Sequence, residues 1–406
     1  MAKVLFLSNG AGEDSIARQI IAQVQGFECE AMPLVSTGAG YGDEVPLLGP
    51  RRALPSGGLI PQDYSRLGRD VCGGMLGLMW QKWRCLRQER SRFSAAVAVG
   101  DLYAVLWALL SGVRPVLFIG TAKSAYHHDY SALEAGALRL LGVRALVRDA
   151  KTAQSLCRRG VQAAWVGNAI MDGLKVSGCD LELKKGEAGL AMFPGSREGT
   201  YAALPGMLSA YEALYRRLSP EEVRPRALVL LAPSVDMQRL AASCSGYRLE
   251  TTAAVEGVVG RLYCDNDDEH PVLLLRGVMA DILQASRLAF GLAGTAHEQA
   301  AGFGMPVLAC DGPESADAPL GWYRGRQKGL LGEALEVVPP RQEIIVTALE
   351  KLWRDEAERK RRGRIGLERM GPAGAARGMA AVIARLARGE ALTSADMAGC
   401  EQLDKL

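Results

Sequence analysis

The sequence predicts an α/β protein made of two doubly wound, Rossmann-like domains, and three observations support this prediction. Short apolar runs alternate with helical stretches along the whole chain. Most of these runs are unbroken, as expected for parallel strands that are buried on both faces. The pattern also starts twice, each time with a strand followed by a glycine turn, at residues 4–12 and 189–199.

Length and composition agree with this class and exclude several others. A chain of 406 residues is too long for one compact core, and 49% hydrophobic residues suffice for two. The 48 basic and 45 acidic residues give a net charge of only +3, which argues against an obligate nucleic-acid binder. The nine cysteines form no C-x-x-C pair, so we expect neither a zinc site nor a disulfide framework.

The first domain is predicted to span residues 1–172. Residues 4–8 form its first strand, the glycine turn follows, and a helix covers residues 14–25. Further apolar runs predict strands at 29–35, 95–99, 115–119, 144–147 and 163–166.

The second domain is predicted at 187–370, after a polar linker at 172–186. It opens with a strand at 189–193 and a helix at 204–218. Further strands are expected at 227–231, 272–275, 288–292 and 306–309. Residues 371–406 are predicted to hold a C-terminal helix and a frayed tail.

The turn after the strand at 189–193 has the composition of a phosphate site. Gly195 allows a phosphate to approach the backbone, Ser196 and successive amides can donate to it, and Arg197 adds a charged donor. The alternative is an ordinary strand-to-helix turn with a surface arginine.

A second candidate anion site follows the strand at 288–292. Gly294, Thr295 and Ala296 would place several amides at a helix N-terminus, and Glu298 or Gln299 would hold a ribose hydroxyl. The alternative is that these small residues serve only close packing of helix on sheet.

Four segments together resemble a known family. They read FLSNGAGED, VGNAIMDGL, FPGSREGTY and AGTAHEQAAGFGMPV, and the resemblance covers residues 4–307. They are similar to a bacterial family related to lipid-A-disaccharide synthase, among the GT-B glycosyltransferases. The resemblance implies a GT-B fold with two domains facing a cleft, a nucleotide-diphosphate sugar as co-substrate, no other cofactor and no catalytic metal.

The resemblance also assigns the two turns. Gly195, Ser196 and Arg197 match the family's GSR element, and 294–296 match its diphosphate-facing turn. Aligned on Pro306, the usual ribose-binding glutamate falls at Gln299, with Glu298 one residue earlier. The choice between these two residues stays open.

The turn after the first strand is expected to face the acceptor. It contains Gly10 and Gly12, followed by Glu13 and Asp14, and Ala11 stands where related sequences have a histidine. Glu13 or Asp14 would act as a reserve general base, with helix capping as the alternative for Asp14.

Asp101 is the first candidate for the general base. It directly follows the buried run at 95–99, and it resembles the strand-end aspartate of lipid-A-disaccharide synthase. A base at this place would take the proton of the acceptor hydroxyl as the anomeric carbon is attacked. Helix capping is an equal alternative.

The stretch at 51–92 is both basic and apolar. It contains nine lysine and arginine residues but only three acidic ones, and tryptophans and leucines lie among them in the sequence. Such a helix can lie on an anionic bilayer, and a solvated helix packed on the core is the alternative. The formal D-x-D at Asp265 and Asp267 is interpreted as a solvated turn rather than a metal site.

The sequence therefore predicts a metal-independent hexosyltransferase that moves a sugar from a UDP-sugar, of the UDP-N-acetylglucosamine type, to a lipid or glycolipid acceptor. A cytoplasmic location is expected, with peripheral contact to the inner face of the cytoplasmic membrane as a further hypothesis. The alternatives are a UDP-sugar epimerase or hydrolase on the same fold, or a degenerate scaffold that binds the donor without turnover.

Overall fold

The computed structural model divides the chain into two compact units. The first comprises residues 1–173 and 373–406, and the second residues 174–372. The structure describes residues 3–51, 75–195, 199–252, 255–265, 267–310, 321 and 323–390. Ser196, Arg197 and Glu198, together with much of the basic stretch at 51–92 and the tail from residue 391, lie outside this part of the chain.

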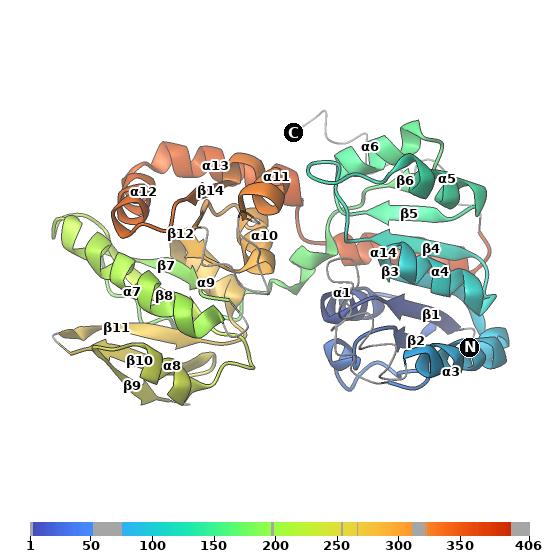
Figure 1. The fold of residues 1–406 in the computed structure, drawn as a ribbon, viewed down its shortest axis with the longest axis horizontal. Coiled ribbons are helices and arrows are strands. Elements are labelled where there is room, and N and C mark those ends of the chain that lie inside the picture. Colours follow the sequence, from blue (N-terminus) through green and yellow to red (C-terminus); the bar gives the residue numbers. More distant parts are fainter. Residues whose placement is uncertain are drawn as a thin grey trace. The chain divides into compact units, whose positions relative to one another are not determined.

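The first unit is built on a six-stranded sheet in the order β2-β1-β3-β4-β5-β6, and all of its pairings are parallel (Figure 1). Nearly every residue of the longer strands is buried, which explains why their sequences show no alternation. The strands are β1 (Lys3–Ser8), β2 (Glu28–Pro33), β3 (Phe93–Gly100), β4 (Val116–Gly120), β5 (Arg144–Val147) and β6 (Ala163–Ala164).

Helices cover both faces of this sheet. One face packs against α3 (Met75–Glu89), α4 (Leu102–Ser111), α5 (Ala132–Leu140) and α6 (Ala150–Arg158). The other packs against α1 (Ala11–Ile21), the short helix η3 (Ala169–Gly173) and α14 (Ala375–Ala387). The last helix of the chain thus completes the core of the first unit, although the second unit lies between them in the sequence.

The second unit contains an eight-stranded sheet in the order β14-β13-β12-β7-β8-β11-β10-β9. Its pairings are parallel except those of β10, which runs antiparallel to β11 and β9. The strands are β7 (Glu187–Phe193), β8 (Arg224–Leu230), β9 (Tyr247–Thr251), β10 (Val258–Cys264), β11 (Asp267–Leu275), β12 (Ser286–Gly291), β13 (Val307–Cys310) and β14 (Leu335–Val338).

Helices α7 (Gly199–Arg217), α8 (Met237–Ser243) and α12 (Gln342–Arg354) share one core cluster with this sheet. The unit also contains α9 (Met279–Ala285), α10 (Gly294–Gly302), α11 (Lys328–Leu331) and α13 (Glu356–Met370). Helices α10 and α13 pack closely because Gly363 and Gly366 of α13 meet the backbone of α10 and of the turn after it.

Both segments that connect the units are anchored by carboxylates. On the outgoing segment, Asp281 of α9 accepts hydrogen bonds from the amides of Ser177, Gly178 and Cys179, at 2.7–3.1 Å for its closer oxygen. On the returning segment, Asp172 accepts from the amides of Gly374 and Ala376, at the start of α14. Each carboxylate belongs to the same unit as the amides it binds.

The predicted class is confirmed: each unit is an α/β domain with a largely parallel sheet. The predicted strands of the first domain correspond to β1–β6, and those of the second to β7, β8, β11, β12 and β13. The sequence prediction missed β14 at one edge of the second sheet and the β9–β10 pair at the other. Among the described residues, no helix has both the length and the apolar character needed to cross a bilayer.

Candidate functional site

The two predicted phosphate turns of the second unit are neighbours. Strands β7 and β12 pair in parallel with Phe193 opposite Gly291, so both end at the same edge of the sheet. The Leu292 amide donates to the Phe193 carbonyl at 2.8 Å, which joins the turns just beyond the strands. A β-carbon on Gly291 would lie 2.5 Å from that carbonyl, so this close approach requires glycine.

Gly195 turns the chain beside this junction. Its φ of 112° lies in the region that favours glycine, and a β-carbon there would stand 3.9 Å from the Leu292 carbonyl oxygen. Thr200, at the start of α7, is fully buried, and its hydroxyl oxygen would lie 3.6 Å from a β-carbon on Gly195. Gly195 thus links the end of β7 to the end of β12, whereas Ser196 and Arg197 lie outside the described residues.

The turn after β12 opens directly into α10. Gly294, Thr295 and Ala296 form its first turn, Thr295 is exposed, and the N-cap residue Ala293 offers no side-chain acceptor. The first amides of a helix have no intrahelical acceptor, and this turn contains no acidic side chain. An anion would be favoured here by the donors and by the helix dipole.

In the next turn of α10, His297 and Glu298 are buried and Gln299 is half-buried. His297 is fully buried, and burial lowers its pKa to about 3, so the ring is neutral at physiological pH. Glu298 is also buried, and its Oε1 accepts a hydrogen bond from Gln327 Nε2 at 3.2 Å. Gln299 is half-buried, one turn along from Thr295. The structure therefore distinguishes the two ribose candidates by access.

In the first unit, the carboxyl ends of β1, β3 and β4 bring together a second set of predicted residues. The side chain of Glu13, in the first turn of α1, fits into space left by two glycines. A β-carbon on Gly10 would come within 2.6 Å of Glu13 Oε2, and one on Gly100 within 3.2 Å of its Cγ. Thr121, just after β4, donates to Glu13 Oε1 at 3.4 Å.

Glu13 has the electrostatic character of a proton-transfer group. Burial raises its pKa above the ordinary value, and the charge of Asp101 raises it further, while its hydrogen bonds act in the opposite direction. A carboxylate with a raised pKa holds its proton more readily than a solvated one, as general acids and bases require.

Asp101 lies close by but is engaged in a cap. Its Oδ1 accepts from the amides of Tyr103 at 2.9 Å and Ala104 at 3.4 Å, at the start of α4. The Oδ1 atom of Asp101 thus caps α4, as the capping alternative predicted. The role of Asp101 as a base stays a prediction.

Asp14 does not cap α1, and the capping hypothesis for it is wrong. The N-cap is Gly10, and Asp14 is the fourth residue of the helix. The side chain is fully buried and accepts from the hydroxyls of Ser8 at 2.6 Å and Ser36 at 2.5 Å. Both carboxylate oxygens are therefore used inside the protein, so Asp14 is poorly placed to touch a substrate.

The network around Asp14 contains a buried residue that is not among the predicted site residues. Lys82 of α3 is 1% exposed and donates to the carbonyls of Pro33 at 2.6 Å and Leu34 at 2.7 Å. Burial lowers its pKa to about 8, against the attraction of Asp14. The local sign that distinguishes this lysine from the exposed cations around it is its spacing of four residues from Leu78 and from Leu86, which are also buried.

Of the other predicted residues, Gly12 is exposed, and a β-carbon there would meet no atom within 4 Å. Among the described residues, no group of three His, Cys, Asp or Glu side chains is placed to hold a metal. Asp265 directly follows β10, and Asp267 is the first residue of β11, where it pairs with Cys264.

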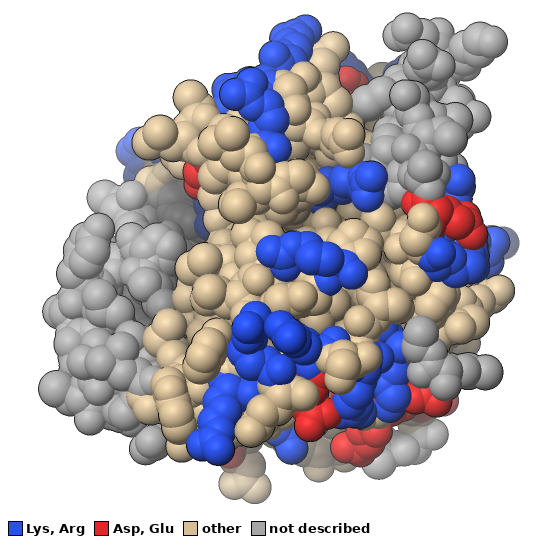
Figure 2. Space-filling model, turned by 90° about the vertical axis from the view of Figure 1, so that its right-hand side faces the viewer, with Lys and Arg blue, Asp and Glu red and all other residues tan. Residues whose placement is uncertain are grey.

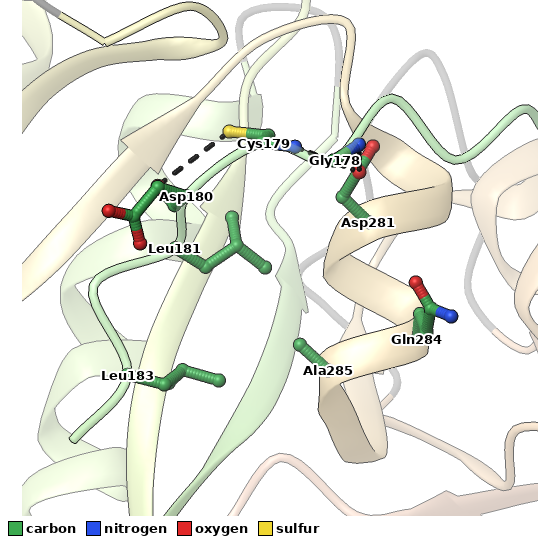
Figure 3. Close-up of a pocket in the computed structure, with 8 residues that line it drawn as sticks. All are labelled: Gly178, Cys179, Asp180, Leu181, Leu183, Asp281, Gln284 and Ala285. Carbon is green, nitrogen blue, oxygen red and sulfur yellow. Dashed lines mark hydrogen bonds between the residues drawn. The ribbon is translucent and has the colours of Figure 1, made fainter.

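A separate pocket of about 300 Å³ lies in the second unit, between the segment at 178–183 and α9 (Figure 3). Asp180, Asp281 and Gln284 are its charged or polar side chains, and Asp281 already binds the backbone amides of the connecting segment. None of the predicted site residues lines this pocket.

Comparisons with known proteins identify the fold. No protein-family model and no curated protein matches the chain. A protein from Listeria monocytogenes assigned as a UDP-N-acetylglucosamine 2-epimerase is similar in structure, with 12% identity, a TM-score of 0.58 and coverage of 97% of this chain and 100% of the other.

Two further solved structures agree. For MurG from Acinetobacter baumannii the identity is 13%, the TM-score 0.55, and the coverage 94% of this chain and 99% of the other. For UDP-GlcNAc 2-epimerase from Neisseria meningitidis bound to UDP-GlcNAc, the identity is 13% and the TM-score is 0.54. The match covers 96% of this chain and 100% of the other. The chain thus has the two-domain GT-B fold that the sequence predicted.

Proposed function

We propose that this chain is an enzyme of nucleotide-diphosphate sugars and that its second unit holds the donor. The observation behind the proposal is the junction of two glycine turns, at Gly195 and Gly291, beside the first turn of α10. Ligands of open α/β sheets bind outside the carboxyl ends of the strands, where this junction lies. The UDP-GlcNAc bound to one structural relative supports the choice of ligand class.

In this proposal the diphosphate lies over the start of α10. The amides of Gly294, Thr295 and Ala296 donate to its oxygens, and Gly195, Ser196 and Arg197 approach from the neighbouring turn. These donors stabilise the charge that develops on the diphosphate when the sugar leaves, which is the role that a metal ion has in other enzymes. The ribose is held by Glu298 or Gln299.

We assign proton transfer to Glu13. Its raised pKa and its place between two glycines support this choice, whereas Asp101 already caps α4 and Asp14 is enclosed by hydroxyls. Asp101 then acts through its charge, which raises the pKa of Glu13. Ala11, at the place of the family's histidine, contributes no proton-transfer group.

The reaction proposed first is transfer of the sugar to a hydroxyl of a lipid or glycolipid. Glu13 takes the hydroxyl proton, the hydroxyl oxygen bonds to the anomeric carbon, and the bond from that carbon to the diphosphate oxygen breaks. The bonding electrons leave with UDP, and the proton stays on Glu13 until solvent removes it. The family resemblance supports this reaction.

A second reaction has comparable support. One of the structural relatives is a UDP-GlcNAc 2-epimerase and another is assigned as one, and each is matched over its whole length. An epimerase would use the same diphosphate site and the same carboxylate without an acceptor. A scaffold that binds the donor without turnover would share only the diphosphate site.

Calorimetry with UDP tests the site that all three functions share. Arg197→Ala removes one charge-assisted donor and should weaken UDP binding by about 10- to 100-fold. Arg216→Ala, an exposed arginine of α7 paired with Glu212, is the matched control and should bind UDP like the parent chain. Equal UDP affinity in the Arg197 variant and the control would remove the basis of the proposal.

Product analysis separates the reactions. The chain is incubated with UDP-GlcNAc, with and without a lipid extract as acceptor, and products are resolved by mass and by sugar configuration. Transfer requires the extract and releases UDP. Epimerisation gives an isomer of the donor sugar without it. Hydrolysis gives UDP and free sugar without the extract. If UDP binds and UDP-GlcNAc is recovered unchanged in both incubations, the chain is a donor-binding scaffold.

A further inference from the structure

The outer surface of the helices on one face of the first unit is unusually apolar. Trp80 and Trp83 of α3 are 55% and 40% exposed, and Leu106 and Leu110 of α4 are 51% and 42% exposed. Helices α3 and α4 pack against each other, so these four side chains belong to one surface. Isolated exposed apolar residues are normal, but large ones gathered on one face mark an interaction site.

The two helices bury their other sides. Leu78, Lys82 and Leu86 recur at intervals of four residues on α3 and point into the unit, and Trp107 does so from α4. The exposed tryptophans and leucines are therefore not needed for packing of the fold. Helix α4 carries no charged residue along its whole length, which is unusual for a helix with a solvent-facing side.

Cations border this apolar surface. Arg84 lies over the Trp80 ring at 5.4 Å, and Arg87 and Arg90 approach Gly112, directly after α4. The sole acid of the two helices is Glu89, and it is paired with Arg92 at 2.6 Å. Figure 2 shows this side of the molecule, with lysine and arginine side chains spread among uncharged ones and acidic groups in fewer places.

The apolar character continues on the next helix of the same layer. Helix α5 follows β4 as α4 follows β3, and both contribute to one core cluster. Leu133 and Leu140 of α5 are 87% and 82% exposed, more than any other large apolar side chain described. Its acid Glu134 is paired with Lys123 at 2.7 Å.

We propose that the outer face of α3, α4 and α5 binds the surface of an anionic phospholipid bilayer. We call it the basic-apolar face and define it by Trp80, Trp83, Leu106, Leu110, Arg84 and Arg87, with Leu133 and Leu140 at its edge. The tryptophans and leucines enter the headgroup boundary, and the arginines pair with lipid phosphates. The proposal is independent of the nucleotide site, which lies in the other unit.

The positive charge of the basic-apolar face favours a lipid bilayer, rather than a second copy of this chain, as its partner. A symmetric contact would bring the same arginines of two copies together, with no free acid of α3 or α4 to oppose them. A bilayer of anionic lipids supplies the opposite charge over the whole face. Aromatic side chains and arginine are also suited to the interface, because each combines an apolar body with a polar end.

Vesicle co-sedimentation of the full chain tests the proposal. The chain should bind vesicles of phosphatidylglycerol and phosphatidylcholine, bind pure phosphatidylcholine much more weakly, and lose binding as salt is raised. Arg84→Gln and Arg87→Gln together should weaken binding by about fivefold for each cation removed. Trp80→Ser and Trp83→Ser should weaken it at least as much.

Matched controls are available in the second unit. Leu367→Ser removes a leucine that is 45% exposed on α13, and Arg364→Gln removes an exposed arginine of the same helix. Both should bind vesicles like the parent chain. Unchanged thermal unfolding of every variant shows that the fold is retained, which is expected because the substituted side chains are exposed.

Two results would overturn the proposal. One is binding that is absent, or equal for anionic and neutral vesicles. The other is a parent chain that does not bind vesicles and sediments as a dimer, while the Trp80→Ser and Trp83→Ser variants sediment as monomers. The face would then be a protein interface. Quenching of tryptophan fluorescence by brominated lipid, lost in the Trp80 and Trp83 variants, would support the proposal directly.

Discussion

The hydroxyl of Thr121 donates a hydrogen bond to Glu13 Oε1 across 3.4 Å, joining the end of β4 to the start of α1. The strands that lead to these residues are not neighbours, because β3 lies between β1 and β4. The contact is made across the end of β3, where Gly100 leaves room for the Glu13 side chain. Sheet order and one glycine thus bring a carboxylate from residue 13 to a hydroxyl from residue 121.

If Glu13 is the base, Glu13→Gln should lower kcat by at least about 100-fold, the lower end of what general-base catalysis contributes. UDP affinity should remain unchanged, because the diphosphate site is assigned to the other unit. Calorimetry and a turnover assay separate the two effects. Glu44→Gln, an exposed carboxylate paired with Arg18, serves as the control and should retain activity. Full turnover by the Glu13 variant would return the assignment to Asp101.

The pH dependence of activity follows from the same group. A base must be ionised, so kcat/KM should rise with pH through the pKa of Glu13, which burial and then Asp101 hold above its usual value. Asp101→Asn should move this limb to lower pH, because it removes the charge that raises the pKa. A pH–rate profile of both chains checks the direction of the shift.

Glu13 should also reduce the stability of the fold at neutral pH. Its pKa is higher in the folded than in the unfolded state, where it is near 4.5, so the folded state binds the proton more tightly. Stability from this group is therefore present below pH 4.5 and falls as the pH rises through the folded pKa. Urea unfolding should show Glu13→Gln to be the more stable chain at pH 7, with the difference vanishing below about pH 4. A parent chain more stable than the variant at pH 7 would contradict the raised pKa of Glu13 in its half-buried position.

Gly291 should tolerate no side chain. Gly291→Ala places a β-carbon 2.5 Å from the Phe193 carbonyl oxygen, so β12 and β7 must separate at the site edge. Such overpacking costs about 1–3 kcal/mol of unfolding free energy, and UDP affinity should fall with it. Gly206→Ala, in the exposed part of α7 where an added β-carbon meets nothing within 4 Å, should be neutral or stabilising by up to about 1 kcal/mol. Equal unfolding midpoints for the two variants would show that the turns are not closely joined.

Much of the fold is predictable from the sequence because the parallel strands are buried on both faces. Unbroken apolar runs such as 189–193 reveal β7, and glycine turns mark where helices follow. The β9–β10 pair is missed because β10 alternates between buried and half-buried residues, and because β9, the edge strand, is half-buried or exposed along its length. The return of α14 to the first unit is also invisible, because its apolar stripe fits a sheet of either unit equally well.

The sequence identifies three candidate carboxylates of the first unit but does not separate their roles. Glu13, Asp14 and Asp101 all follow buried strands, so local pattern makes each a candidate, and the family resemblance places Asp101 first. Burial separates them: Asp14 is enclosed by Ser8 and Ser36, and Asp101 binds the amides of α4. These contacts arise from residues far apart in the chain, which pattern alone does not bring together.

The ribose assignment can be decided by two variants. Glu298 is buried beside Gln327, and Gln299 is more accessible on the side of α10 that carries Thr295. If Gln299 holds the ribose, Gln299→Ala should lose the preference for UDP over its 2′-deoxy analogue, by about 10-fold for one hydrogen bond. Glu298→Gln should then keep that preference. The opposite pattern would assign the ribose to Glu298 and make Gln327 its positioning residue.

Asp281 should stabilise the second unit by fixing the segment that enters it. Burial alone would raise its pKa, but hydrogen bonds from the amides and hydroxyl of 177–179 outweigh burial and leave the pKa below its usual value. The stabilisation is therefore complete above the unfolded pKa, near 3.8, and is lost as pH falls toward the folded pKa. Asp281→Asn should lower the unfolding free energy at pH 7 by about 1.5–3 kcal/mol, the range for a hydrogen bond to a charged group.

The matched control for Asp281 is a carboxylate of the same pocket. Asp180 is exposed and its carboxylate accepts a hydrogen bond from the Glu182 amide, so Asp180→Asn should change the unfolding free energy by less than about 0.5 kcal/mol. The gap between the Asp281 variant and the parent chain should narrow as the pH is lowered below about 4. A gap that stays constant with pH would mean that shape and packing, rather than the charge of Asp281, hold the connecting segment in place.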